Sequence, residues 1–221
     1  MDKEFLRKYD LQSNNVIRPE EKHRTLVQDM AAHYPVEMIA GGAVQNTIRV
    51  AQWFFSQPRV ATIFGTVGDD NFAQQMRTKA EEDRVLVAYL TDYSNPTGTC
   101  ACLITNRGKD RSLVAFLDAS QHFSRHFLEE NFRLVEKARI IYTSGFFLTV
   151  NFEAQLLLAR HVHSLPVGRK LFTFNLSAPF LATRCKSELK QILPYVDILF
   201  GNEAEALAVA EMQGWNVSVL L

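Results

Sequence analysis

The chain lacks the features that mark several large protein classes. Its 221 residues include three cysteines and no Cys-x-x-Cys pair, which predicts free thiols in a reducing compartment. No apolar run approaches the roughly 18 residues of a membrane-spanning helix, and the first residues lack the apolar centre of a signal peptide. The formal net charge is zero, without the positive excess of a nucleic-acid binder. We therefore expect a cytoplasmic protein that binds neither nucleic acid nor membrane.

Two common nucleotide-binding motifs are missing as well. The sequence contains no Gly-x-x-x-x-Gly-Lys-Ser/Thr and no Gly-x-Gly-x-x-Gly, which disfavours a P-loop NTPase and a dinucleotide-binding fold. His122 and His126 have the spacing of metal ligands on a helix, but no third ligand is evident nearby. Asp69 and Asp70 follow a glycine and precede a helical pattern, so we interpret them as a helix cap rather than a catalytic acid pair.

What the sequence does contain is a regular alternation of β-rich and helical segments. This alternation predicts an α/β fold with a mostly parallel sheet covered by helices on both faces. Three consecutive β-rich runs interrupt the alternation, and we expect them to form a small separate sheet, the last two joined by a five-residue hairpin loop. The predicted strands are 14–18, 36–40, 60–65, 85–90, 99–105, 112–117, 140–144, 170–174 and 198–200, and the predicted helices are 3–9, 19–33, 43–56, 71–83, 122–137, 151–163, 180–193 and 202–213.

The helix that follows Gly41-Gly42 is the most distinctive of these. Its apolar stripe covers more than half of the circumference, so a mostly buried helix is predicted, with Asn46 inside the apolar arc. One interpretation is that a small polyhydroxylated ligand binds at this helix start, held by the Gly42 N–H and by Asn46. The alternative is a glycine turn and an asparagine that hydrogen-bonds to neighbouring backbone.

Unusual residues follow four of the predicted strands. Ligands in open α/β sheets bind outside the carboxyl ends of the strands, so these motifs are expected to share one cleft. The four motifs are Gly41-Gly42 through Asn46, Gly145-Phe146-Phe147, Asn175 to Pro179, and Gly201 to Glu205.

The side chains in these motifs suggest the type of ligand. Phe146 offers a flat face for stacking on a base, with plain core packing as the alternative. Asn202 and Glu205 suit a hydrated Mg²⁺ near phosphate, or else form an N-cap with a glutamate at the third helical position. Arg111 borders a β-rich run and either reaches a phosphate or is solvated.

Several motifs follow one another along the chain. They are Ala-Gly-Gly-x-x-Gln-Asn ending at Asn46, Pro96 to Cys100, Arg111 to Ala115, Glu136 to Arg139, Gly145 to Thr149, Asn175 to Phe180, and Pro194 to Glu203. Together they resemble the adenosine kinases of the ribokinase-like, or PfkB, family of sugar and nucleoside kinases, from about Lys3 to Trp215 and in the family's order. The resemblance implies a three-layer sandwich with a mostly parallel central sheet, one kinase domain over residues 1–221, and a small β lid within about 14–18 and 85–117.

The resemblance also implies a reaction and a set of site residues. The reaction is transfer of the γ-phosphoryl group of ATP to the 5′-hydroxyl of adenosine, which gives AMP and serves purine salvage. The implied partners are adenosine, ATP and Mg²⁺, and the full-length form is expected to be a cytoplasmic monomer, with the nucleus as a second location. The implied residues are Gly42 and Asn46 for ribose, Phe146 for adenine, Cys100, Leu113 and Ala115 for the lid side of the pocket, Arg111 for the transferred phosphate, and Asn175, Asn202 and Glu205 for ATP phosphates and, through water, Mg²⁺.

The sequence departs from the family pattern in two places. It contains no Gly-Ala-Gly-Asp segment, which in relatives supplies the anion hole and the aspartate base, and it opens after the usual first strand with Gly-Asn-Pro. We therefore expect a kinase domain truncated at both ends, whose catalytic aspartate lies beyond residue 221. The alternatives are a non-catalytic product that binds nucleoside or a partner, and a kinase for another nucleoside or a sugar.

Overall fold

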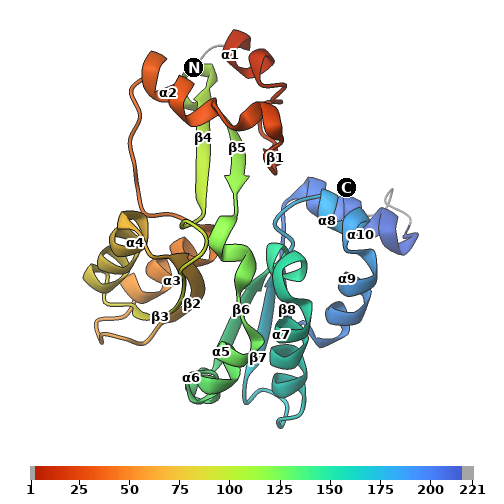
Figure 1. The fold of residues 1–221 in the computed structure, drawn as a ribbon. Helices are drawn as coiled ribbons and strands as arrows, with labels where there is room; N and C mark the ends of the chain where they lie inside the picture. The colour runs from red at the N-terminus through yellow and green to blue at the C-terminus, as the bar shows by residue number, and fades with distance from the viewer. Residues whose placement is uncertain (1–2, 216–221) are drawn as a thin grey trace. The chain divides into compact units, whose positions relative to one another are not determined.

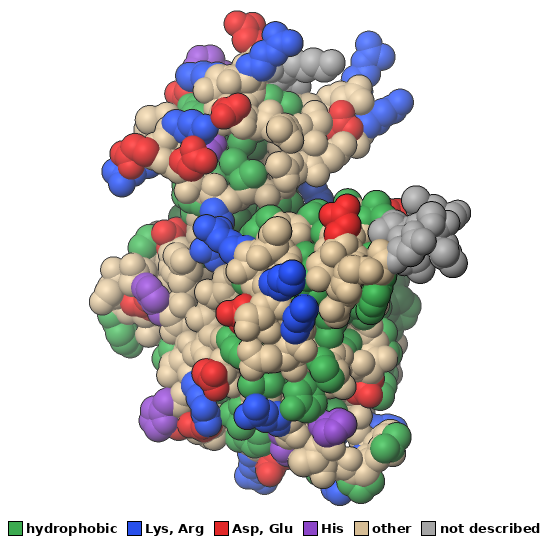
Figure 2. Space-filling model, turned by 90° about the vertical axis from the view of Figure 1, so that its right-hand side faces the viewer, with side chains coloured by type: hydrophobic (Ala, Val, Ile, Leu, Met, Phe, Trp, Pro, Cys, Tyr) green, Lys and Arg blue, Asp and Glu red, His purple; other side chains and the backbone are tan. Residues whose placement is uncertain are grey.

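The computed structural model describes residues 3–215. The chain divides into two compact units, each made of segments that are distant in the sequence (Figure 1). No helix in the described part of the chain is both long and apolar enough to cross a bilayer. Figure 2 shows basic and acidic side chains interspersed on the face drawn, in keeping with the zero formal net charge.

The first unit comprises Met1–Gly41, Thr66–Lys79 and Thr91–Ser120, and the second comprises Gly42–Gly65, Ala80–Leu90 and Gln121–Leu221.

The first unit is built around a three-stranded sheet with the order β1-β5-β4. Strand β4 (Thr99–Thr105) pairs antiparallel with β5 (Asp110–Phe116), and β1 (Val16–Ile17) pairs parallel with β5. Helices α1 (Lys3–Lys8) and α2 (Leu26–His33) cover one face of this sheet. Because strand side chains alternate between faces, every second residue of β4 enters this core and the others lie on the open face. The buried core consists of Phe5, Leu6, Tyr9, Leu11, Leu26, Met30, Ala101, Leu103 and Val114.

The second unit contains a parallel sheet with the order β6-β7-β8. Strands β6 (Ile140–Ser144), β7 (Leu171–Asn175) and β8 (Ile198–Phe200) match the sequence prediction to within one residue. The long helix α7 (Gly145–His163) packs on β6 and β7, and α9 (Lys186–Ile192) packs on α7. Strand–helix alternation therefore produces the predicted parallel arrangement in this part of the chain.

The first of the three consecutive β-rich runs does not join the hairpin sheet. It forms β3 (Leu86–Asp92), which pairs with β2 (Thr62–Gly68) in a separate two-stranded sheet. Val85 and Ile63 are buried together in a small core of the second unit. The expectation of one separate sheet from three consecutive runs was thus wrong for its first member, because burial of Val85 beside β2 returns the chain to that strand.

Two helices begin elsewhere than predicted. The helix expected from Pro19 becomes a 3₁₀ turn, and α2 starts only at Leu26. His23 is fully buried in that turn, and one of its ring nitrogens lies 3.0 Å from the Tyr9 carbonyl oxygen, so a tertiary contact replaces regular helix. Helix α7 starts before the predicted residue, but Asn151 inside it has non-helical torsions and its side chain accepts the Ala154 N–H. The predicted start is therefore an internal cap.

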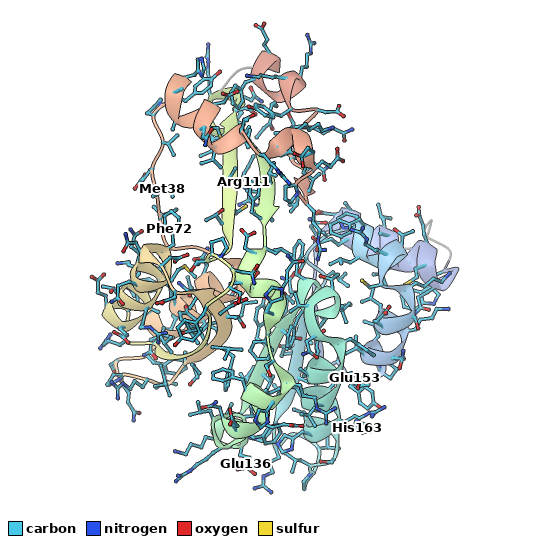
Figure 3. The ribbon with its side chains drawn as sticks, viewed as in Figure 1. Met38, Phe72, Arg111, Glu136, Glu153 and His163 are labelled. Atoms are coloured by element: carbon cyan, nitrogen blue, oxygen red, sulfur yellow. The ribbon has the colours of Figure 1, made fainter. Side chains whose placement is uncertain are left out.

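Residues 36–40 are the one predicted strand that does not form. The segment, on which Figure 3 labels Met38, has no strand pairing among the described residues. Met38 and Ile39 are 56% and 76% exposed. An apolar run forms a strand only beside another strand, and no strand among the described residues pairs with this segment. The remaining elements are η1 (Glu21–His23), α3 (Ala43–Trp53), α4 (Asn71–Glu82), η2 (Asn106–Gly108), η3 (Asp118–His122), α5 (Arg125–Glu130), α6 (Phe132–Lys137), α8 (Phe180–Arg184), η4 (Leu193–Tyr195) and α10 (Glu203–Gln213).

Helix α3 reverses the predicted orientation over much of its length. Gln45 and Gln52 are buried, whereas Val50, Trp53 and Phe54 are 55%, 75% and 74% exposed. The prediction of an inward apolar stripe was correct only for the first turns, where Val44 and Ile48 pack on the small core.

A hydrogen-bond demand explains this reversal. The Gln52 side-chain oxygen accepts the N–H groups of Val60 and Ala61, at 2.9 and 3.0 Å, and its amide nitrogen donates to the Gln57 carbonyl at 2.8 Å. Gln45 accepts the hydroxyl of Tyr89. Because buried backbone groups need partners, the two glutamines face inward and the apolar residues on the other side of the helix face outward.

Candidate functional site

The carboxyl ends of the three parallel strands lie in register. Ser144 pairs with Asn175, and Asn175 pairs with Phe200, so the residues that follow these strands leave the sheet at one edge. Three of the four motifs predicted from the sequence are therefore brought together. The fourth, at the start of α3, belongs to a helix that contacts β6 in the same unit.

A serine that the sequence did not single out links these strand ends. The Gly145 N–H donates to the Ser177 hydroxyl at 3.1 Å, and this hydroxyl donates to the Asn175 carbonyl at 3.0 Å. The Ser177 N–H also donates to the Asn175 side-chain oxygen at 2.8 Å. Such an Asx turn could have been found from the Asn-x-Ser sequence after a strand. Its effect is to hold the amide of Asn175 at the sheet edge.

The glycine at the start of α7 is required by close backbone packing. A Cβ at Gly145 would lie 2.5 Å from the Leu176 carbonyl oxygen, so no other residue fits without a backbone shift. The next residue, Phe146, is half-buried and meets Phe180 at a ring-centroid distance of 6.1 Å and an interplanar angle of 67°. Phe146 therefore packs against the core at this edge, which agrees with the alternative interpretation and leaves its role toward a base as a prediction.

Asn202 and Glu205 form a closed pair at the start of α10. The Asn202 side chain accepts the Glu205 N–H at 2.9 Å, while the Glu205 carboxylate accepts the Asn202 N–H at 3.0 Å. This is the capping-box alternative of the sequence analysis. Glu205 is 7% exposed, and a Cβ on Gly201 would lie 3.3 Å from its carboxylate. A carboxylate already bonded in this way fits a Mg²⁺ that keeps its waters better than a directly coordinated one.

The start of α3 is open by comparison. Gly42 has φ +104°, a conformation that requires glycine, and no side chain caps the helix there. Asn46 is exposed, which corrects its predicted burial, and its side-chain oxygen accepts a long 3.5 Å hydrogen bond from Arg49. Asn46 lines a groove of about 420 Å³ with Arg49, Val50, Trp53, Glu82, Asp83 and Arg84.

The residues predicted for the lid share one face of the hairpin. Cys100 pairs with Ala115, and two residues along β4, Cys102 pairs with Leu113. Arg111 is exposed and continues this row on β5 (Figure 3). The three predicted lid residues, Cys100, Leu113 and Ala115, thus lie with Arg111 on the open face of the sheet in the first unit, opposite α1 and α2.

A second group of polar residues fixes the base of the hairpin. The Asp70 carboxylate accepts the N–H and the hydroxyl of Thr97, both at 2.7 Å, and the N–H of Ala73 at 2.8 Å. The Thr97 hydroxyl in turn accepts the Gly68 N–H at 2.9 Å. Desolvation acts to raise the pKa of Asp70, but the hydrogen bonds from Thr97 and the backbone outweigh it and lower this pKa from its usual 3.8. The interpretation of Asp70 as a cap is confirmed, and its bonds to Thr97 were not predicted.

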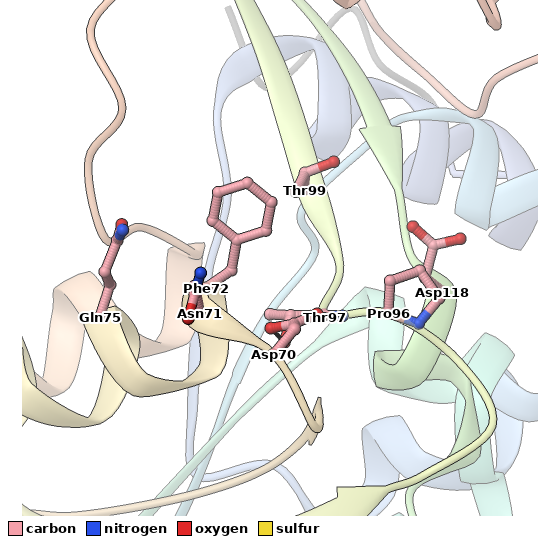
Figure 4. A pocket seen from close by; sticks show the side chains of 8 residues that line it. All are labelled: Asp70, Asn71, Phe72, Gln75, Pro96, Thr97, Thr99 and Asp118. Atoms are coloured by element: carbon pink, nitrogen blue, oxygen red, sulfur yellow. Dashed lines mark hydrogen bonds between the residues drawn. The ribbon is translucent and has the colours of Figure 1, made fainter.

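A cavity of about 520 Å³ lies beside the hydrogen-bonded pair Asp70–Thr97 (Figure 4). Thr99 lines it from the hairpin, and Thr99 has the same strand parity as Ala101, whose side chain is in the core. None of the predicted lid residues lines this cavity. Its lining residues are Asp70, Asn71, Phe72, Gln75, Pro96, Thr97, Thr99 and Asp118.

Comparison with known proteins gives consistent matches along the chain. A model of the pfkB family of carbohydrate kinases matches residues 3–221. Adenosine kinase 2 of Arabidopsis thaliana is 42% identical over 218 residues, which are 98% of this chain and 62% of that protein. The chain thus spans less than two thirds of the length of this curated relative.

Solved structures give the same result. A crystal structure of Anopheles gambiae adenosine kinase, in complex with P1,P4-di(adenosine-5) tetraphosphate, matches with a TM-score of 0.91 and 44% identity, over 97% of this chain and 63% of that one. Adenosine kinase from Schistosoma mansoni in complex with 2-fluoroadenosine matches with a TM-score of 0.90 and 32% identity, over 98% and 62% of the two chains.

Proposed function

Because the chain belongs to the pfkB family of carbohydrate kinases, we propose that it carries the nucleoside-binding and phosphate-binding elements of an adenosine kinase. The proposed reaction transfers the γ-phosphoryl group of ATP to the 5′-hydroxyl of adenosine and yields AMP and ADP. The observation that carries this proposal is the common edge at which β6, β7 and β8 end, since ligands of parallel sheets bind there.

The proposed nucleoside-binding residues of the second unit lie on two structural elements. At the start of α3, Gly42 and Asn46 present a backbone N–H and an amide, which suit the two ribose hydroxyls. Phe146, at the end of β6, offers its ring to adenine. Cys100, Leu113 and Ala115, on the open hairpin face of the first unit, are proposed separately, on the resemblance, as apolar contacts for the nucleoside.

The proposed phosphate side uses the ends of β7 and β8. Asn175, held by Ser177, and the Asn202–Glu205 pair would face ATP phosphates and a hydrated Mg²⁺. Arg111, in the first unit, is proposed separately, on the resemblance, as a contact for the transferred phosphate. When bound, Mg²⁺ neutralises charge that develops on the phosphate oxygens. The residues of this chain position the phosphates, and the closed capping box prevents Glu205 from turning away from the edge.

The test measures binding and turnover separately on the 221-residue chain. We expect saturable adenosine binding in isothermal titration and no ADP release with ATP and Mg²⁺, because the sequence holds no Gly-Ala-Gly-Asp segment. Phe146→Ala should weaken adenosine binding, whereas Phe132→Ala, on α6, should not. Turnover at rates typical of kinases would contradict the expected incompleteness. A folded chain that binds no adenosine would favour the alternative of a sugar or another nucleoside, which titration with those ligands would identify.

Location and assembly are separate proposals. Cys100, Cys102 and Cys185 are all free thiols, which supports a reducing compartment such as the cytoplasm. We also propose that the full-length form is monomeric, which sedimentation of that form would check.

A further inference from the structure

Two thiols stand next to each other on the open face of the hairpin. Cys100 and Cys102 are two residues apart on β4, both exposed, and their side chains point to the same side of the sheet. The third cysteine, Cys185, is buried in the second unit. Cys100 is one of the residues proposed to contact the nucleoside, and Cys102 is not.

The spacing of the two thiols excludes a direct bond between them on a regular strand. Residues two apart are separated by about 6.6–6.8 Å. A disulfide needs Cβ atoms about 3.5–4.5 Å apart. A bridging atom relaxes this limit, because two metal–sulfur bonds of about 2.3 Å each span much of the gap once the thiols lean together. On a regular strand, one atom bonded to both sulfurs therefore fits this pair better than a direct disulfide bond does.

The residues near the two cysteines restrict which kind of atom can bridge the sulfurs. No group of three or more His, Cys, Asp or Glu suited to a metal occurs among residues 3–215, so the pair offers two thiolates and no further protein ligand. Desolvation raises the pKa of Cys100, the neighbouring Cys102 raises it further, and Arg111 lowers it. The incoming centre must therefore displace protons, which soft thiophilic centres do.

We propose that Cys100 and Cys102 form a dithiol site for a soft thiophilic centre that accepts two thiolates. Phenylarsine oxide is the suitable probe, because its arsenic keeps one organic substituent and binds two sulfurs. Two As–S bonds form, the As–O bond breaks, and the oxygen leaves as water with the two thiol protons. Arsenic and sulfur keep their oxidation states, so no oxidant is needed.

The first experiment measures the intact mass of the chain after treatment with one equivalent of phenylarsine oxide. We expect one bridged adduct, stable to a monothiol and removed by a dithiol. Cys100→Ser and Cys102→Ser should each lose this stability, while Cys185→Ser should keep it. An adduct that survives the monothiol in Cys102→Ser, or its absence in the unmodified chain, would overturn the proposal.

A second experiment tests the consequence for the nucleoside pocket, and this step rests on the proposed function. Since Cys100 pairs with Ala115 and Cys102 with Leu113 on the proposed lid face, a bridged adduct should weaken adenosine binding at least tenfold. In Cys102→Ser the probe should have no such effect. Unchanged adenosine affinity with the adduct in place would refute the competition. A chain that forms the adduct but binds no adenosine would refute the proposed function and leave the dithiol site standing.

Discussion

Helices α3 and α10 have the same length, yet they begin in opposite ways. Each has 11 residues; Gly42 directly precedes α3 and Asn46 is its fourth residue, whereas Gly201 and Asn202 directly precede α10. In α10, Asn202 and Glu205 satisfy each other and Glu205 is buried. In α3, Gly42 provides no side-chain cap and Asn46 is exposed.

The difference separates a helix start that is closed from one that is open. The first N–H groups of a helix lack intrahelical partners, so a helix start without a side-chain cap attracts an oxygen-rich ligand. Helix α4 resembles α10, because Asp70 caps it and also holds Thr97. Closed starts therefore act in stability and positioning, and the open start of α3 is the better candidate for direct contact with a ligand.

The largest effect on stability is expected at the closed start of α4. Asp70→Ala removes the partner of three hydrogen bonds and should lower the free energy of unfolding by about 2 kcal/mol in urea titration. Asp69→Ala, at the exposed neighbouring position, is the matched control and should change it little. Equal effects of the two variants would show that the hydrogen bonds of Asp70 make no specific contribution to the free energy of unfolding.

The same carboxylate predicts a pH dependence. Its pKa is lowered in the folded chain from the usual 3.8, so its stabilisation is present above that pH and is lost as the pH falls through the folded pKa. The stability difference between the unmodified chain and Asp70→Asn should therefore shrink below about pH 4 in urea titrations. A difference that grows on acidification would contradict the assignment of these hydrogen bonds to the ionised form.

A smaller loss is expected at α10. Asn202→Ala removes one half of the capping box and should cost about 1 kcal/mol. Glu203→Ala, at an exposed position of the same first turn, should cost less than half of that. If Asn202→Ala were neutral for stability but abolished adenosine binding, the capped start of α10 would act in ligand binding. That result would contradict the distinction between closed and open helix starts.

The sequence predicted most of the second unit because its signals are local. Strands β6 to β8 are apolar runs followed by glycine or asparagine, and the three strand ends align as the rule for parallel sheets requires. The orientation of α3 was mispredicted because a helical wheel counts apolar residues. It does not register that Gln52 is needed inside to bond the 57–61 turn.

The site was less predictable than the fold for the same reason. Ser177 and Thr97 act through hydrogen bonds to residues far along the chain or in an irregular turn, and neither has a periodic pattern. The shared face of Cys100, Leu113 and Ala115 could be predicted from the sequence, because strand alternation determines it once the hairpin register is known.

The open start of α3 depends on glycine at one position and not at the other. Gly42→Ala places a side chain at φ +104° and should cost about 1 kcal/mol, although its Cβ meets nothing closer than 3.9 Å. Gly41→Ala has similar space and no positive φ, so it should be nearly neutral. If both variants are neutral in urea titration, the backbone relaxes at residue 42, and backbone strain is not the reason why this position needs glycine.

The smallest effect on stability should accompany a clear effect on binding. Asn46 is exposed and its side chain makes a long bond to Arg49, so Asn46→Ala should change the free energy of unfolding by less than about 0.5 kcal/mol. If its amide bonds a ribose hydroxyl, the same change should weaken adenosine binding about tenfold, as loss of one hydrogen bond does. Thr47→Ala is the control, because Thr47 is exposed and bonds only within its own helix. Equal adenosine affinity for both variants would mean that α3 is open without being a binding site, and the comparison with α10 would then concern stability alone.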